Sequence, residues 1–119
     1  MTSTNDTLAL RIPIQAAVQQ ETTENRIQRA VADVEKSLGS DVVRIRYELS
    51  TNWCDEPAVY FRIILSDAAS TTKTKVWEIC NRVKDEIDER VDFGALGLAR
   101  YHHVRSASEQ AALKEEAWA

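Results

Sequence analysis

The sequence predicts an α+β domain, a two-layer sandwich in the β-α-β-β-α-β order of ferredoxin-like proteins, with two helices packed on one face of a mostly antiparallel sheet. Three observations lead to this prediction. Residues 58–66 are the most continuously apolar, strand-prone stretch of the chain. Residues 42–50 alternate in polarity and precede that stretch by a loop too short for a parallel crossover. Two stretches with helical periodicity flank this hairpin.

Composition and charge describe an ordinary small globular protein. Its 119 residues correspond to one domain, with 44% hydrophobic and 29% charged residues. The formal net charge of −4 argues against strong nonspecific attraction to nucleic acid or to an anionic membrane. No apolar run approaches the roughly 20 residues that span a bilayer. Without a signal peptide or a disulfide framework, the chain is expected in the cytoplasm.

We expect residues 1–6 to form a flexible N-terminus, 7–105 a single α+β domain and 106–119 a C-terminal helix or tail. Residues 7–12 alternate, with Leu8, Leu10 and Ile12 on one side, which is typical of a short strand. If that strand does not form, the alternative is an α-β-β-α domain whose unpaired strand edge dimerises by strand addition.

The first helix is expected to end at Leu38, because Gly39 is a common residue just after a helix. Its apolar stripe consists of Ile27, Ala30, Val31, Val34 and Leu38. Two starting points remain open. The helix either runs unbroken over 13–38 from Pro13, or restarts near Thr23 as its N-cap, which we favour slightly.

The two strands of the hairpin each have a helix-facing side and an outer side. In 42–50 the expected helix-facing residues are Val43, Ile45, Tyr47 and Leu49, and the outer ones are Val42, Arg44, Arg46 and Glu48. In 58–66 the expected helix-facing residues are Val59, Phe61, Ile63 and Leu65, and the outer ones are Tyr60, Arg62 and Ile64.

A second long helix follows, for which Asp67 or Ser70 is the expected cap. Trp77 borders its apolar stripe, at the margin of the core; the stripe comprises Val76, Ile79, Cys80, Val83, Ile87 and Val91. After Gly94 and Gly97, residues 98–105 are predicted to form the last strand. The pair Ser106 and Glu109 matches a capping box, which predicts a short C-terminal helix.

No group of residues in the sequence has the spacing that catalysis or metal binding requires. His102 and His103 are adjacent, so in a strand they point to opposite faces and do not share a metal ion. Cys54 lies beside two acidic residues that make its thiol a poor nucleophile, and Cys80 falls on a buried stripe. There is no glycine-rich phosphate loop. We therefore predict no catalytic residue, no metal and no cofactor.

The outer sheet face and two exposed tryptophans are the expected partner-binding residues. The face combines basic and aromatic side chains on an otherwise acidic protein, with either Tyr101, His103 and Arg105 or their alternates from the last strand. Trp53, in the hairpin loop, and Trp118, near the end, are candidate anchors. The candidate set is Arg44, Arg46, Trp53, Tyr60, Arg62, Tyr101, His103 and Trp118.

These features favour a non-catalytic protein-interaction or accessory module, antitoxin-like in character, that forms a homodimer or binds a protein partner through its open sheet face. The alternative is binding of RNA or single-stranded DNA through the same basic and aromatic face. Against that alternative, residues 59–65 lack the glycine and paired aromatic residues of the RNA-recognition signature.

The hairpin and the C-terminal stretch together resemble a group of small uncharacterised bacterial α+β proteins. The hairpin carries the pattern Arg-Ile-Arg-Tyr at 44–47, Trp53, Asp55 and Pro-Ala-Val-Tyr-Phe-Arg at 57–62. The C-terminal stretch carries Arg105, Ser106, Ser108, Glu109, Gln110, Leu113 and the ending Ala-Trp-Ala at 117–119. The resemblance implies a cytoplasmic bacterial protein and no particular activity.

Overall fold

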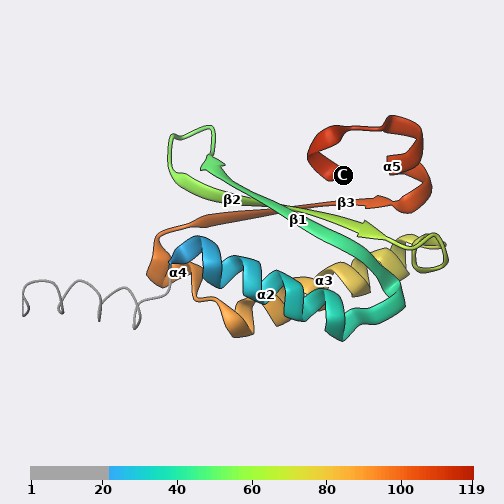
Figure 1. Cartoon of the computed structure of the whole chain (residues 1–119), viewed down its shortest axis with the longest axis horizontal. Helices are drawn as coiled ribbons and strands as arrows, with labels where there is room; N and C mark the ends of the chain where they lie inside the picture. The colour runs from blue at the N-terminus through green and yellow to red at the C-terminus, as the bar shows by residue number, and fades with distance from the viewer. Residues whose placement is uncertain (1–21) are drawn as a thin grey trace, which may run out of the picture.

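The computed structural model describes residues 22–119, which form an α+β fold (Figure 1). The expected flexible N-terminus, the strand at 7–12 and the first half of the 13–38 helix lie outside the described residues. In chain order the elements are α2 (Thr23–Leu38), β1 (Val42–Thr51), β2 (Pro57–Leu65), α3 (Lys73–Arg90), α4 (Phe93–Leu96), β3 (Ala99–Ser106), α5 (Ala107–Leu113) and a final 3-10 turn (Glu116–Trp118).

The sheet has the order β1-β2-β3 and is mixed. β1 and β2 form the predicted antiparallel hairpin, whereas β2 and β3 run parallel and are joined through α3. The predicted mostly antiparallel sheet is therefore wrong for the described strands. A ferredoxin-like sheet would also hold a strand between β2 and β3, but these two strands pair directly, from Ala58 with Ala99 to Leu65 with Ser106.

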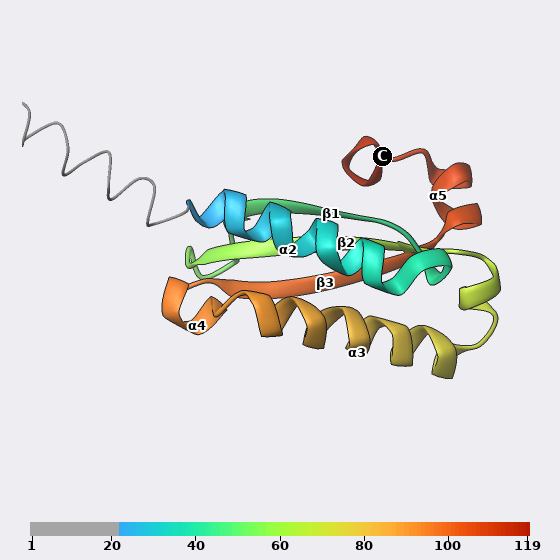
Figure 2. The same cartoon turned by 60° about the horizontal axis from the view of Figure 1, so that its bottom comes forward.

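Helices α2 and α3 lie side by side on one face of the sheet (Figure 2). The predicted stripe of α2 is fully confirmed, because all five of its residues are buried. They join Phe61 and Ile63 of β2 and Val83 and Ile87 of α3 in a single hydrophobic core. Phe61 packs edge-on against Phe93, with 6.0 Å between ring centroids. The most apolar strand, β2, is thus the middle strand of the sheet, and the core residues of α2 and α3 pack on it.

Side-chain caps set where the two long helices begin. The Thr22 hydroxyl accepts a hydrogen bond of 3.1 Å from the Asn25 N–H, so α2 begins at Thr23, one residue from the predicted restart. Gly39 ends the helix with a φ of 56°, a conformation that favours glycine. For α3 the cap is Thr72, and neither Asp67 nor Ser70 as predicted.

A bulge in β1 corrects the predicted alternation of that strand. The register with β2 shifts between Val42 and Arg44, which turns Val42 into the core and leaves Val43 48% exposed. The Glu35 carboxylate accepts a 2.7 Å hydrogen bond from the Ile45 N–H on this edge. Leu49, at the hairpin end, is 39% exposed. The predicted outer positions of Arg44 and Arg46 are unaffected, because the bulge lies before them.

Candidate functional site

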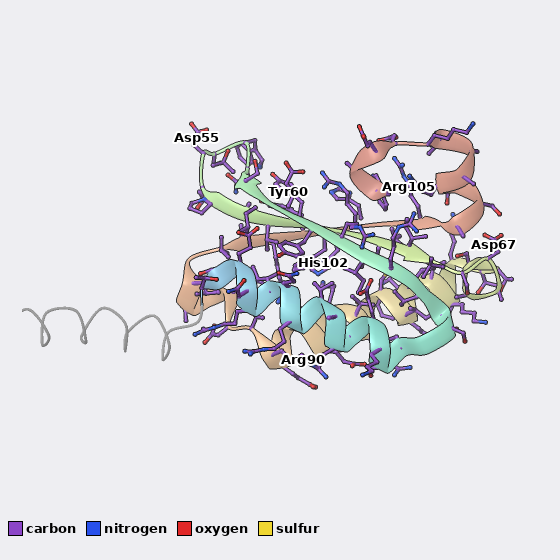
Figure 3. All side chains as sticks on the ribbon, viewed as in Figure 1. Asp55, Tyr60, Asp67, Arg90, His102 and Arg105 are labelled. Carbon is purple, nitrogen blue, oxygen red and sulfur yellow. The ribbon has the colours of Figure 1, made fainter. Side chains whose placement is uncertain are left out.

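The sheet face opposite α2 and α3, here called the reverse face, gathers most of the predicted partner-binding residues. Its residues are Arg44, Arg46 and Glu48 of β1, Tyr60, Arg62 and Ile64 of β2, and Tyr101, His103 and Arg105 of β3. Arg46, Arg62 and His103 form one row across the three strands. Figure 3 shows Tyr60 and Arg105 on this face and His102 on the helix side, which settles the open parity of the last strand.

At the hairpin end of the reverse face, two tyrosines already contact each other and neighbouring polar groups. Tyr60 and Tyr101 stack on each other at 5.2 Å with an interplanar angle of 19°. The Tyr60 hydroxyl donates to the Thr51 carbonyl at 2.8 Å, and the Asn52 amide donates to the Tyr101 hydroxyl at 3.1 Å. Each ring therefore covers part of its neighbour's stacking surface. Trp53 stands clear of them at the tip of the loop, 91% exposed.

The other end of the reverse face is covered by residues 107–119, here called the C-terminal strap (Figure 1). The Arg44 Nε donates to the Trp118 carbonyl at 3.0 Å, and the Arg46 Nε donates to the main-chain oxygen of Ala119 at 2.6 Å. Trp118 is buried, and Ile64 of the reverse face is only 1% exposed. The prediction of Trp118 as an exposed anchor is wrong, and the reverse face is less open than expected.

Arg105 links the sheet to the C-terminal strap. Its guanidinium lies over the Trp118 ring, 4.2 Å from the centroid. The same group donates to the Gln110 side-chain oxygen at 3.0 Å and forms a 2.7 Å ion pair with Glu115. The predicted capping box of Ser106 and Glu109 is confirmed and begins α5 at this point. The strap is thus a defined element built on β3.

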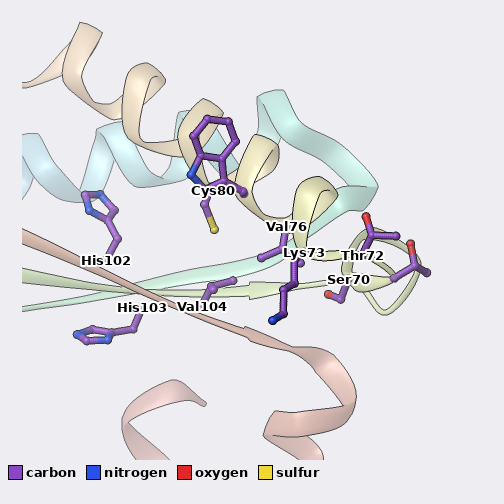
Figure 4. Close-up of a pocket in the computed structure, with 10 residues that line it drawn as sticks. Ser70, Thr72, Lys73, Val76, Cys80, His102, His103 and Val104 are labelled. Carbon is purple, nitrogen blue, oxygen red and sulfur yellow. The ribbon is translucent and has the colours of Figure 1, made fainter.

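A second candidate site lies along the outer edge of β3. An unpaired strand edge was the alternative expectation from the sequence, but the groove beside it was not predicted. Within residues 22–119, β3 is an edge strand with no strand on its far side. Between it and the first half of α3 is a groove of about 520 Å³, here called the β3 groove, lined by Lys73, Val76, Trp77, Cys80, His102 and Val104 among others (Figure 4).

Apolar side chains stay exposed in the β3 groove. Trp77 is 68% exposed and Val104 37% exposed. Trp77 therefore does not lie at the core margin as predicted. The only indication of this exposure in the sequence was the position of Trp77 beside the apolar stripe of α3 and not on it. Cys80 is half-buried, and burial raises the pKa of its thiol, so this cysteine is a poor nucleophile.

His102 and His103 both border the β3 groove, His102 from the helix side of the sheet and His103 from the reverse face, so the two rings stand on opposite sides as predicted. The His102 ring stacks on Phe61 at 5.1 Å, and its buried Nε2 has no hydrogen-bond partner among residues 22–119. Desolvation, aided by Lys84, Arg100 and His103, lowers the pKa of His102 from 6.5 to about 4. The ring is therefore neutral near pH 7.

This shift predicts a loss of stability in acid. The unfolded chain binds a proton on His102 near pH 6.5 and the folded chain only near pH 4, so the free energy of unfolding falls as the pH drops through that interval. The half-buried ring is screened in part by solvent, which reduces the expected loss to about 1–2 kcal/mol. In urea titrations at pH 7 and pH 4.5, His102→Phe should lose this component. The matched His103→Phe should keep it, and an equal effect of both variants would contradict the assignment.

Comparisons with protein-family models, curated proteins and solved structures gave no match for this chain. Among residues 22–119, no three His, Cys, Asp or Glu side chains are grouped so that they could hold a metal ion. Within the same range no helix has the length and apolarity needed to cross a membrane. The function must therefore be argued from the reverse face and the β3 groove themselves.

Proposed function

We propose that the protein is a non-catalytic interaction module that binds an extended segment of a partner protein along the outer edge of β3. The observation that carries this proposal is a strand edge that no strand of residues 22–119 pairs, beside an exposed apolar groove. An edge strand offers free N–H and C=O groups to an incoming strand, and an adjacent groove receives alternate side chains of that strand. Strand addition needs no catalytic group.

The side chains of the β3 groove suit such a segment. Val76 of α3 and Val104 of β3 line the groove from its two walls (Figure 4). Trp77 of α3 also lines it, so an apolar side chain of the incoming strand would contact both walls. Exposed tryptophan is a frequent energetic centre of protein interfaces. A partner that covers Trp77 would bury a large apolar area, because 68% of the surface of this residue faces solvent. The groove thus supplies apolar contact in addition to backbone hydrogen bonds.

Charge indicates which kind of segment fits. β3 contains Arg100 and Arg105, the neutral His102 and no acidic residue, and Lys73 lies on the groove wall. Two β3 strands paired with each other would bring the two arginines of each copy near those of the other, which is unfavourable although Asp88 and Glu115 of the same chain pair with them. A segment of alternating apolar and acidic residues avoids that repulsion. We therefore favour an acidic partner strand over the homodimer expected from the sequence.

We place the protein in the cytoplasm, as its cysteines suggested from the sequence. Both Cys54 and Cys80 are free thiols, and Cys54 is exposed at the hairpin loop. An exposed free thiol is stable in a reducing compartment and is readily oxidised outside one.

The test is binding of a ten-residue, dye-labelled peptide of alternating valine and glutamate to the full chain, followed by fluorescence anisotropy. We expect a Kd between about 1 µM and 1 mM, since one short strand buries little surface. Val104→Lys should weaken binding at least about tenfold, because it places a long charged side chain in the apolar groove. No detectable binding of this peptide would overturn the proposal.

The control is Leu49→Lys on β1. Leu49 is 39% exposed and Val104 37%, but Leu49 lies on the opposite edge strand of the sheet. If both lysine variants weaken binding equally, the peptide does not use β3. Light scattering on the same samples detects the competing occupant: a dimer that Val104→Lys dissociates would identify a second copy of the chain on this edge and contradict an acidic partner strand.

A further inference from the structure

We propose that the C-terminal strap covers a second binding surface, and that single-stranded nucleic acid binds to the reverse face when the strap is displaced. This inference is independent of the β3 groove, which lies on the outer edge of the sheet. It rests on what the strap itself presents to the arginines: one aromatic ring and the main-chain oxygens of two consecutive residues.

The Trp118 ring occupies the position that a base would take. It lies against the Arg105 guanidinium at 4.2 Å and is buried there. A guanidinium plane stacks on nucleobases as it does on indole, and both stack with little regard to sequence. Trp118 therefore shows that Arg105 is arranged for stacking with a flat aromatic group.

Main-chain oxygens of Trp118 and Ala119 occupy positions suited to phosphate oxygens. Arg44 and Arg46 are two residues apart on β1, so both point from the reverse face, and each donates through Nε to one of these oxygens. A phosphate oxygen accepts the same hydrogen bonds, and it adds a negative charge that the Trp118 carbonyl lacks. A phosphate would thus bind Arg44 more strongly than the Trp118 carbonyl does.

Removing the strap would uncover a strongly basic surface on an acidic protein. The reverse face carries four arginines, at 44, 46, 62 and 105, and one acidic residue, Glu48, which pairs with Arg62 at 2.9 Å. The strap at present supplies Glu115 as the partner of Arg105. The covered chain should therefore bind nucleic acid weakly, because only the fraction with a displaced strap is competent.

The experiment measures binding of a dye-labelled, mixed-sequence 12-nucleotide RNA to the full chain at low and moderate salt. Trp118→Ala should bind at least about tenfold more tightly than the unsubstituted chain, because it weakens the strap without removing an arginine. The gain should fall steeply with salt and disappear in Trp118→Ala/Arg44→Ala. Trp77→Ala is the matched control, since Trp77 lies on α3 on the other side of the sheet, and its affinity should not change.

A second measurement does not depend on any variant folding. Saturating RNA should speed hydrogen exchange of the α5 amides in the unsubstituted chain, because binding displaces the strap. Exchange that stays constant or slows would overturn the inference, as would equal affinities of Trp118→Ala and the unsubstituted chain. Val104→Lys should leave RNA binding intact, so a failure of the peptide proposal and a failure of this one are distinguishable.

Discussion

Replacing Phe61 with alanine is expected to lower the free energy of unfolding by about 3–5 kcal/mol, the largest single effect we predict. Phe61 is fully buried in the middle strand and touches two aromatic rings, Phe93 on one side and His102 on another. The loss combines the burial of the ring with the cavity that its removal leaves. Urea denaturation followed by circular dichroism measures it.

The conservative change Phe61→Leu keeps most of the buried volume and should cost clearly less than the alanine variant. A loss below about 1 kcal/mol for Phe61→Ala would contradict a core built on β2. Because domains of this size have about 5–15 kcal/mol in total, the alanine variant loses a large fraction of its stability, and a stabilising salt in the buffer keeps the folded baseline measurable.

The second large effect is expected at Trp118. Trp118→Ala should cost about 3 kcal/mol, the lower end for a buried tryptophan, because the strap packs on the outside of the sheet. It also removes the stacking partner of Arg105. The matched change Trp77→Ala should stay within about 0.5 kcal/mol, since Trp77 is 68% exposed. The two thermal unfolding curves should therefore differ clearly.

Equal effects of the two tryptophan changes would contradict the position of the strap on the reverse face. In the same samples, hydrogen exchange distinguishes a local loss of stability in the strap from a loss of stability of the whole domain. In Trp118→Ala the α5 amides should exchange faster than they do in the unsubstituted chain. The exchange of the α2 amides should not change, because the substitution leaves the core residues Ile27 and Val34 of α2 in place.

Local periodicity was sufficient to predict the elements that face the core. The stripe of α2 and the alternation of β2 from Val59 to Leu65 were predicted correctly, because burial on one face leaves a regular apolar pattern in the sequence. The outer positions of Arg44, Arg46, Tyr60 and Arg62 follow from the same alternation. Val42 and Val43 were misplaced, because a bulge shifts the register without leaving a pattern.

Strand order could not be predicted in the same way. The parallel pairing of β3 with β2 depends on contacts between residues more than thirty positions apart, such as Tyr60 and Tyr101. Periodicity left the buried side of β3 open, and it does not say which strand lies beside β3. The ferredoxin-like order was inferred from the succession of elements alone, and the described sheet pairs differently.

The candidate sites were predicted in part for a related reason. The reverse face was identified by residue, but its cover was not, because the contact of Arg105 with Trp118 forms only when the chain turns back after α5. The predictions for two tryptophans were wrong. Trp118 was expected to be exposed and is buried, and Trp77 was expected at the core margin and is exposed. Single aromatic residues at the margin of a helix or in a tail carry no period from which burial can be inferred.

The central claim, that the outer edge of β3 accepts an extended strand, is tested most directly by nuclear magnetic resonance. The alternating valine and glutamate peptide is titrated into the isotope-labelled full chain, and backbone amide and Trp77 indole shifts are followed. We predict that the largest changes fall on residues 99–106 and on Trp77, with slower exchange of β3 amides in the complex. Shifts confined to β1 or to the reverse face, with β3 and Trp77 unchanged, would contradict the claim.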